Sequence, residues 1–422
     1  MNEYDSNRIL DLVKTIGYVS TKNILDTDCY VLNTCHIREK ATDKVYHDIG
    51  RIRKKFKDKK KPILLVAGCV AQAESNEILK RNSYIDGVIG PQSYHLIPKM
   101  IKEIEDKKNK INNTEFDVIE KFDKLNLLRN TNSNISSFLT IQEGCDKFCH
   151  FCVVPYTRGP EHSRSFDEIL SEAKQLIDNG SKEITLLGQN VNAYSHEKYR
   201  LSDLINELNG YDGLERIRYT TSHPKDMTND LIDVYQSCSK LMPLLHLPVQ
   251  SGSSKILKLM NRKHNIEEYI NIIERLKKKR PSIKFSSDFI IGYPGENEND
   301  FDSTVSLMKN IEFINSYSFV FSPRPGTPAS NLNNIDPDTC KRRLKIFQET
   351  SDQVKKNYRK KLLNKKLKVL FEKKLNEQEK YFGRDEYGDP VIVESKINIK
   401  GKNLNVKINN FNRNTLFGEI AA

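Results

Sequence analysis

Strand-like and helix-like segments alternate six times between about residues 137 and 335, and this repetition constrains the fold more than any other feature of the chain. The strand-like stretches are FLTIQEG, EITLLGQN, RIRYTTSHP, LLHLPVQSG, IKFSSDFIIGYPG and SYSFVFSPRPG. Helical segments separate them, as in FDEILSEAKQLIDNG, where Ile169, Ala173 and Leu176 share one face. Strands that alternate with helices form parallel sheets, so we expect a six-fold open relative of the eight-fold βα barrel.

Polar or glycine-containing tips follow each of these predicted strands. Because the carboxyl ends of parallel strands meet on one rim, we expect the side chains there to line a common pocket. Some of them would serve only turns or backbone hydrogen bonds. The candidates are Cys145, Gln189, Asn190, Ser222, His223, Gln250, Ser251, Asp288 and Arg324.

The first 105 residues carry a second set of strand-like stretches, CYVLNTC, PILLVAGCV and IDGVIG, between helical segments. This order predicts a small doubly wound domain with a parallel sheet. Cys35 and Cys69 each stand just after a strand. Ligands of such sheets gather beyond the carboxyl ends of the strands, so we expect these two cysteines to act together.

The remaining zones differ in composition and in the pattern of their residues. Residues 106–136 are polar and Asn-rich, which predicts a linker between the first domain and a barrel with a trailing helix over 137–360. Residues 361–422 alternate and carry turn residues, which predicts a small β-barrel of a kind that often binds oligonucleotides.

Positive charge is concentrated before this last zone. Between Lys341 and Lys380 there are 15 Lys or Arg residues against 5 Asp or Glu, in a chain of net charge +12. Such a segment suits a polyanion such as RNA, and the alternative is a solvated helix face.

The composition and the lengths of the apolar runs predict the cellular location of the chain. With 37% hydrophobic and 29% charged residues the chain is typical of globular proteins. We expect no membrane contact and a cytoplasmic location, because no apolar run is long enough to span a bilayer and no secretory signal is visible. Thiols stay reduced there, so grouped cysteines indicate metal or cluster binding. The isolated Cys29, Cys238 and Cys340 are interpreted as small buried apolar residues.

The grouped cysteines Cys145, Cys149 and Cys152 have the spacing Cys-x3-Cys-x2-Cys in a loop directly after a strand. A structural zinc site wants four ligands, and His150 or His162 would have to complete it. A ferredoxin-type cluster needs a fourth cysteine, and none with a local motif stands nearby. The interpretation that remains is a four-iron cube in which three thiolates hold three irons and a small-molecule chelate binds the fourth.

This loop resembles that of the radical S-adenosylmethionine superfamily, whose open iron binds the amino and carboxylate groups of S-adenosylmethionine. The resemblance implies that reductive cleavage of this cofactor yields a 5′-deoxyadenosyl radical, and that Phe151 lies beside its adenine. By position on the rim, the other residues expected near the cofactor are Gln189, Asn190, Ser222, Gln250, Asp288 and Arg324.

Further stretches resemble one family of this superfamily, the methylthiotransferases, and within it the branch that acts on isopentenyladenosine beside the tRNA anticodon. They are LNTCHIREKA, AGCVAQ, GCDKFCHFCVVPYTRGPEHSR, EITLLGQNVNAY, TTSHPKD, HLPVQSGS, LKLMNRK, SSDFIIGYPGE and FSPRPGTPA. The family's layout is an N-terminal domain with a second, auxiliary iron–sulfur cluster, the radical barrel, and an RNA-binding barrel called TRAM.

The resemblance implies two [4Fe-4S] clusters and two uses of S-adenosylmethionine. The auxiliary cluster supplies sulfur, which one S-adenosylmethionine methylates, and the radical from a second removes hydrogen from carbon 2 of the adenine. The partners implied are the tRNA anticodon stem-loop and a reductant such as flavodoxin or ferredoxin, and we expect a monomer.

One departure from the family concerns the auxiliary cluster, which the family binds through three cysteines. Cys35 and Cys69 match two of them, and the third normally lies in a stretch ending in Cys-Gln-Met-Asn just ahead of EYDS. This sequence begins MNEYDS, and the hypothesis is that its start is assigned too late. Cys29 precedes Cys35 by six residues on a predicted strand, hence about 20 Å away, and is a poor substitute.

Two alternatives remain open. The first is a sister methylthiotransferase that acts on threonylcarbamoyladenosine or on an aspartate of a ribosomal protein. The second is an RNA-binding protein whose first domain has lost its cluster and no longer transfers sulfur.

Overall fold

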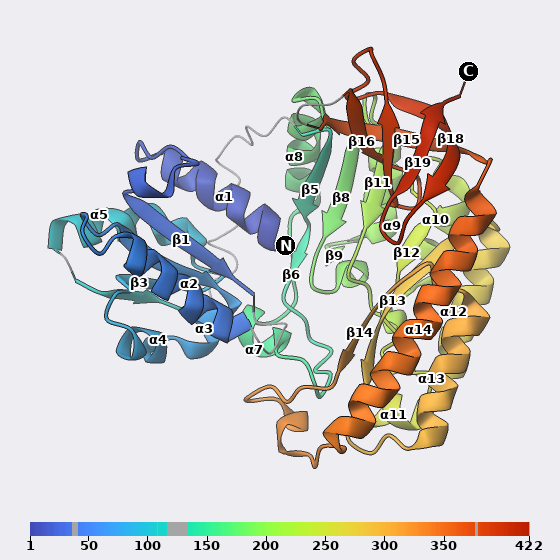
Figure 1. Ribbon diagram of the computed structural model, residues 1–422, viewed down its shortest axis with the longest axis horizontal. Helices are drawn as coiled ribbons and strands as arrows, with labels where there is room; N and C mark the ends of the chain where they lie inside the picture. The colour runs from blue at the N-terminus through green and yellow to red at the C-terminus, as the bar shows by residue number, and fades with distance from the viewer. Residues whose placement is uncertain (36–40, 108, 116–133, 376–378, 422) are drawn as a thin grey trace. The chain divides into compact units, whose positions relative to one another are not determined.

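The computed structural model describes residues 1–35, 41–107, 109–115, 134–375 and 379–421 (Figure 1). The chain divides into two compact units. Unit 1 consists of Met1–Thr131, Gln142–Arg164 and Arg324–Ser330, and unit 2 of Asn132–Ile141, Ser165–Pro323 and Asn331–Ala422. Among the described helices, none combines the length and the apolar character that a membrane span requires.

Unit 1 contains a four-stranded parallel sheet in the order β1-β2-β3-β4. The strands are β1 (Cys29–Thr34), β2 (Ile63–Gly68), β3 (Gly87–Ile89) and β4 (Ile111–Asn113). The helices are α1 (Asn2–Lys14), α2 (Ala41–Lys55), α3 (Cys69–Glu74), α4 (Asn76–Arg81) and α5 (Ile97–Lys107). Separate apolar clusters lie on the two faces of the sheet, one built with α1 and α5 and the other with α2 and α4. The predicted doubly wound domain is confirmed.

Strand β4 lies inside the stretch that the sequence predicts as a linker. It pairs with β3 through the register of Gly87 with Ile111 and Ile89 with Asn113. The pairing is made by backbone groups, so it does not require the apolar side chains that reveal β2 in the sequence.

Unit 1 also holds the segment that carries the three grouped cysteines. The strands β6 (Gln142–Glu143) and β7 (His162–Ser163) pair antiparallel and enclose it, and α7 (Val154–Arg158) forms its second half. Helix α3 packs against α7 within this unit.

Unit 2 contains the six predicted parallel strands, in two sheets of order β5-β8-β11 and β12-β13-β14. The strands are β5 (Ser136–Thr140), β8 (Glu183–Leu187), β11 (Arg216–Tyr219), β12 (Leu244–His246), β13 (Lys284–Ile291) and β14 (Asn315–Val320), with a small hairpin of β9 (Ser195–His196) and β10 (Tyr199–Arg200). The helices are α8 (Phe166–Asp178), α9 (Leu201–Asn209), α10 (Asn229–Ser237), α11 (Ser254–Leu259), α12 (Ile266–Lys279), α13 (Glu298–Ile311) and α14 (Pro337–Leu362).

Alternation along the strands separates the two faces of the open barrel. In β13 the side chains of Phe285, Phe289 and Ile291 join the apolar core with the helices. Asp288 and Ile290 point to the opposite, inner face, since successive side chains of a strand alternate. The inner face therefore carries polar and apolar side chains and lies outside this core.

The C-terminal part of unit 2 is a closed five-stranded barrel in the order β15-β16-β17-β19-β18, as predicted. Its strands are β15 (Lys366–Lys374), β16 (Lys380–Arg384), β17 (Pro390–Glu394), β18 (Asn403–Phe411) and β19 (Leu416–Ile420). Arg216, at the start of β11, donates hydrogen bonds to the carbonyls of Lys368, Arg384 and Asp385 in this barrel. The small barrel is thus attached at the amino ends of the open barrel's strands.

Candidate active site

The three grouped cysteines lie on a tightly turned loop. Gly144 has a φ of +75°, and a Cβ atom there would stand 1.8 Å from the carbonyl oxygen of Pro160. The backbone N–H of Cys145 bonds to the carbonyl of Gly159 at 3.2 Å, and that of Cys152 bonds to the carbonyl of Cys149 at 2.9 Å. The glycine allows the two ends of the loop to approach.

The thiols of this loop are partly or fully withdrawn from solvent. Cys149 is buried, whereas Cys145, Cys152 and the adjacent Phe151 are partly buried. Burial raises the pKa of the Cys145 thiol to about 12, and the neighbouring Cys152 and Cys149 contribute in the same direction. A thiolate at this position therefore requires a cation beside it, as in metal or cluster coordination.

The donor set of this loop consists of three thiols. Among the described residues, no three His, Cys, Asp or Glu side chains stand close enough to hold a single metal ion. A four-iron cluster places each thiolate on a different iron, so its ligands are spread more widely than those of one ion. The donor set of three shielded thiols on one loop fits such a cluster.

Cys35 and Cys69 each follow the carboxyl end of one of two neighbouring strands. Their preceding residues, Thr34 and Gly68, are register partners in the neighbouring strands β1 and β2. The hydroxyl of Thr34 donates to the carbonyl of Ala67 at 2.6 Å, which ties the two strand ends together. Both cysteines are partly buried and follow the carboxyl ends of their strands.

A buried arginine links the two cysteine-bearing segments of unit 1. Arg158, on α7, donates to the carboxylate of Asp5 on α1 at 2.8 Å and lies 3.7 Å from the carboxylate of Glu143. Burial opposes the charge of Arg158, but Asp5, Cys69 and Glu143 overcome this effect and raise its pKa. Gln92 donates to the carbonyl of Arg158 at 2.7 Å. Nothing in the sequence indicates this pair, whose members are 153 residues apart.

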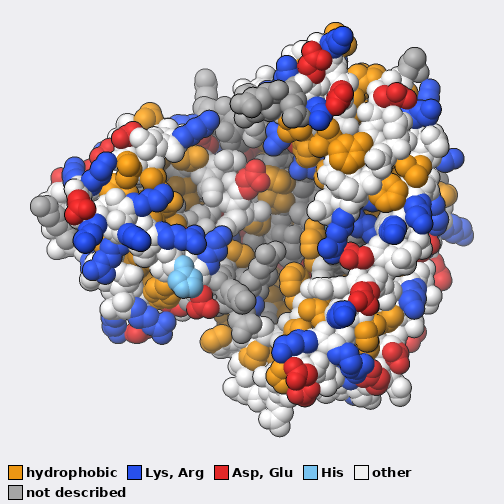
Figure 2. Space-filling model, in the orientation of Figure 1, with side chains coloured by type: hydrophobic (Ala, Val, Ile, Leu, Met, Phe, Trp, Pro, Cys, Tyr) orange, Lys and Arg blue, Asp and Glu red, His pale blue; other side chains and the backbone are white. Residues whose placement is uncertain are grey.

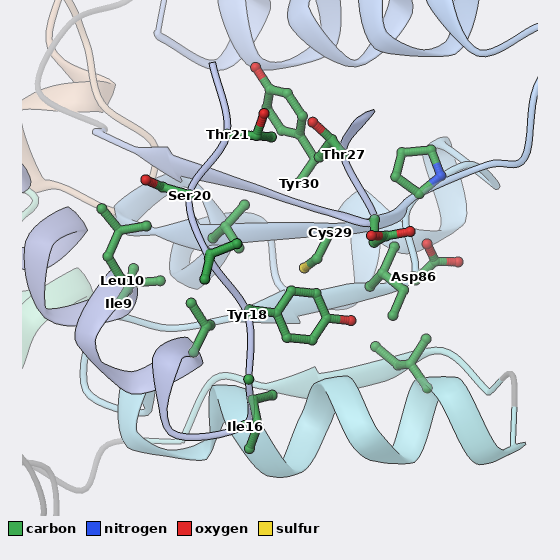
Figure 3. A pocket seen from close by; sticks show the side chains of 18 of the residues that line it. Ile9, Leu10, Ile16, Tyr18, Ser20, Thr21, Thr27, Cys29, Tyr30 and Asp86 are labelled. Carbon is green, nitrogen blue, oxygen red and sulfur yellow. The ribbon is translucent and has the colours of Figure 1, made fainter. Parts of the chain in front are cut away.

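A groove of 1360 Å³ runs beside β1 (Figure 3), and Cys35 is not among the described residues that line it. Cys29 and Tyr18 point into it from β1 and from the segment after α1. Cys29 stands at the opposite end of β1 from Cys35 and packs with the apolar cluster of α1 and α5. This packing agrees with its interpretation as an apolar residue, but Cys29 is only partly buried.

The predicted rim residues of unit 2 follow their strands as expected. Asn190, after β8, is buried and donates to Asp226 at 2.7 Å, while Gln189 is partly buried. Ser222, after β11, is buried, and its hydroxyl has no hydrogen-bond partner among the described residues. Buried polar groups are normally hydrogen-bonded, so this hydroxyl is available to a water molecule or a ligand.

Other rim residues have structural partners. The backbone of His223 bonds reciprocally with the side chain of Asn192. Ser251 is fully buried and accepts the backbone N–H of Ser253 at 3.2 Å, so it serves a turn. Gln250 has a φ of +79° and joins β13 through backbone bonds.

The last two candidates, Asp288 and Arg324, belong to different compact units. Asp288 points to the inner face of the open barrel, where it lies 3.5 Å from His246, a residue that the sequence did not single out. Arg324 belongs to unit 1, and the same short segment bonds to the cysteine loop through the N–H of Ala329 and the carbonyl of His150. The residues that were predicted to share one rim therefore belong to two compact units.

The basic stretch lies on exposed structure. Figure 2 shows Lys and Arg side chains along the visible face of α14, with acidic side chains between them. The exposed lysines near the end of α14 and the start of β15 are Lys356, Lys360, Lys361, Lys365, Lys366 and Lys368.

Two family models match the chain. Residues 139–308 match the radical SAM superfamily, and residues 1–90 match the family described as "Uncharacterized protein family UPF0004". In a comparison of structures, the chain is similar to the radical S-adenosylmethionine methyltransferase TsrM from Kitasatospora setae, with a TM-score of 0.57 and 12% identity. That match covers 78% of this chain and 74% of the other, and at this identity it concerns the fold alone.

Similarity to characterised sequences extends over the whole chain. A tRNA-2-methylthio-N(6)-dimethylallyladenosine synthase from Pelagibacter ubique (strain HTCC1062) is 61% identical over 426 residues, which cover 100% of this chain and 95% of the relative. The enzyme of the same name from Wolbachia pipientis subsp. Culex pipiens (strain wPip) is 47% identical, over 99% of this chain and 97% of the relative.

The six-stranded open barrel and the three-cysteine loop, together with the match over residues 139–308, define a radical S-adenosylmethionine enzyme. Within that superfamily, the chain belongs to the tRNA-2-methylthio-N(6)-dimethylallyladenosine synthase family of methylthiotransferases.

Proposed function

We propose that this chain transfers a methylthio group to carbon 2 of N6-isopentenyladenosine next to the tRNA anticodon. The observation that carries the proposal is the joint placement of two cysteine sets in unit 1. Cys69 begins α3, and α3 packs against α7, which begins two residues after Cys152. A reaction that brings sulfur to a radical centre requires two such sites in one compact body.

The residues divide between two cofactor sites. Cys145, Cys149 and Cys152 would hold a [4Fe-4S] cluster with S-adenosylmethionine, and Cys35 and Cys69, with one further ligand, an auxiliary [4Fe-4S] cluster. Bound together, these groups supply a 5′-deoxyadenosyl radical and a transferable methylated sulfur. The chain itself binds, orients and shields them.

Charge and burial support this assignment of residues to two cofactor sites. A cluster ligated by thiolates carries negative charge, and Arg158 is a buried cation between the cysteine-bearing segments. Phe151 is proposed to lie beside the cofactor adenine. Asn190 and Ser222, whose buried hydroxyl has no partner among the described residues, are proposed as further polar groups for the cofactor.

The remaining parts would serve the RNA. The closed C-terminal barrel and the exposed lysines that precede and open it suit the phosphate backbone of an anticodon stem-loop, without sequence specificity. We propose further that a small reductant such as flavodoxin or ferredoxin supplies electrons, and that the protein works as a monomer in the cytoplasm, where tRNA resides.

Nucleoside mass spectrometry tests this proposal. The chain is expressed in a bacterial strain that lacks its own methylthiotransferase for isopentenyladenosine, and its tRNA is digested and analysed. We expect 2-methylthio-isopentenyladenosine to appear with the wild-type chain and not with the Cys145→Ala variant. Methylthio groups on threonylcarbamoyladenosine instead would identify the sister activity, and no new nucleoside would favour a tRNA-binding protein without sulfur transfer.

A further inference from the structure

Two aromatic rings are exposed on the inner face of the open barrel. Tyr317 and Phe319 on β14 have exposed fractions of 58% and 45%. The strand register places Tyr317 beside Asp288 and Phe319 beside Ile290. Partners in neighbouring parallel strands point to the same side, so all four share the inner face. Alternate residues of a strand are about 7 Å apart, which makes the two rings one continuous apolar strip.

A polar pair lies directly beside this strip. Nδ1 of His246 lies 2.9 Å from the hydroxyl of Ser286, and its Nε2 lies 3.5 Å from the carboxylate of Asp288. The ring of His246 meets that of Tyr317 edge-on, with centroids 6.4 Å apart. Both imidazole nitrogens are therefore held by neighbours, and the ring has a fixed position next to the apolar strip.

We infer that Tyr317 and Phe319 bind the isopentenyl tail of the substrate adenosine, while His246 and Asp288 border its base. This inference rests on the proposed function. An N6-isopentenyladenine joins a flat, polar base to a branched apolar tail, and the inner face joins a polar pair to an apolar strip in the same way. Ile290 extends the strip with an aliphatic side chain, which suits an aliphatic tail.

The competing use of exposed rings in an RNA-binding protein is to stack bases. Stacking accepts any base, because every base has a π-face. Tail recognition instead distinguishes a prenylated adenosine from an unmodified one. The two uses therefore predict different responses to the same substitutions.

The experiment measures the affinity of the reconstituted protein, with S-adenosylmethionine, for two anticodon stem-loops that differ only in the isopentenyl group. Wild-type protein should prefer the prenylated stem-loop by about tenfold or more, as expected for contact with several apolar groups. Phe319→Ala and Tyr317→Ala should each reduce that preference several-fold and leave the affinity for the unmodified stem-loop unchanged.

Two further variants serve as controls. Phe319→Leu keeps apolar bulk and should retain most of the preference. Ile270→Ala removes a side chain that is 38% exposed on α12, on the opposite side of the strands, and should change neither affinity. Iron content and melting temperature, measured on every variant, establish that each is folded and loaded.

Three results would overturn the inference: an equal loss of affinity for both stem-loops, an unaltered preference in both alanine variants, or a wild-type protein without any preference. The first would assign the rings to base stacking. A retained and Phe319-dependent preference without methylthio product would leave the inference intact and contradict the proposed function.

Discussion

Arg158 and Asp5 form a buried ion pair of 2.8 Å that joins the helix following the cysteine loop to the first helix of the chain. Their side chains are 4% and 1% exposed. In unit 1 this pair ties the helix after the three-cysteine loop to the first helix of the domain that carries Cys35 and Cys69. Either charge would be costly to bury alone, so each of the two buried side chains depends on the presence of the other.

Removal of Asp5 should therefore destabilise unit 1. Asp5→Ala leaves the buried guanidinium of Arg158 without its main partner, which costs about 3–5 kcal/mol. We expect a lower melting temperature and reduced iron uptake. Glu3→Ala, on the same helix but exposed, is the matched control and should change neither. Equal stability of the two variants would contradict the assigned role of the pair.

Substitutions in the two cysteine sets should have different effects on iron content and on cleavage of S-adenosylmethionine. Cys35→Ala and Cys69→Ala are expected to lower the iron content from about eight to about four per chain, while cleavage of S-adenosylmethionine continues. Methylthio transfer should be lost. Iron analysis and 5′-deoxyadenosine release measure both effects after anaerobic reconstitution. About four irons in the wild-type protein would instead mean that the auxiliary cluster does not assemble on this chain.

Cysteines outside the two sets provide the control. Cys238 is buried, and its thiol bonds to the side chain of Asn209 at 3.1 Å. Cys238→Ser keeps a donor at this position and should leave iron content and S-adenosylmethionine cleavage unchanged. Cys149→Ala, by contrast, should abolish both cleavage and about four irons. Loss of iron in the serine variant would place Cys238 among the ligands.

The attachment of the C-terminal barrel should depend on Arg216. Its side chain is 1% exposed and bonds to three carbonyls of the barrel and to the side chain of Asn403 at 3.0 Å. Arg216→Met leaves these acceptors unpaired, and each buried orphan costs about 1–3 kcal/mol. We expect faster limited proteolysis between α14 and β15.

A surface pair gives the matched control for this variant. Arg413 and Asp352 are paired at 2.8 Å but remain 75% and 50% exposed. Arg413→Met should cost less than about 1 kcal/mol and leave the proteolysis rate unchanged. Similar rates in the two variants would show that Arg216 does not hold the barrel.

The exposed lysines should contribute charge and not specificity to RNA binding. Lys360→Ala and Lys365→Ala are each expected to weaken binding of every stem-loop alike. Each should reduce the slope of log affinity against log salt by about one. A salt titration of stem-loop affinity measures this. An unchanged slope in both variants would exclude this surface from the RNA interface.

Much of the fold could be predicted from local patterns. Strand β2 is apolar throughout because both faces of its sheet are covered, so the sequence reveals it directly. The placement of Cys35 and Cys69 after neighbouring parallel strands follows from the same logic. Strand β4 was not predicted, because Asn112 and Asn113 have a weak preference for strands. Its backbone pairing with β3 overrides this preference.

The candidate site was less accessible to sequence reasoning. The ion pair of Arg158 with Asp5 and the attachment of Arg216 join residues more than 150 positions apart, and no local pattern encodes such partners. The grouping of the cysteine loop with the first domain is likewise a property of long-range packing. His246 remained unnoticed because a single histidine in a short strand has no motif, and only the register reveals Ser286 and Asp288 beside it.

The most direct measurement is the product formed by the purified, anaerobically reconstituted protein with S-adenosylmethionine, a reductant and an isopentenyladenosine-containing anticodon stem-loop. Mass spectrometry of the digested RNA should show adenosine that carries both the isopentenyl group and a methylthio group at carbon 2, together with 5′-deoxyadenosine. Release of 5′-deoxyadenosine while the RNA stays unchanged, from protein that holds both clusters, would contradict the assignment.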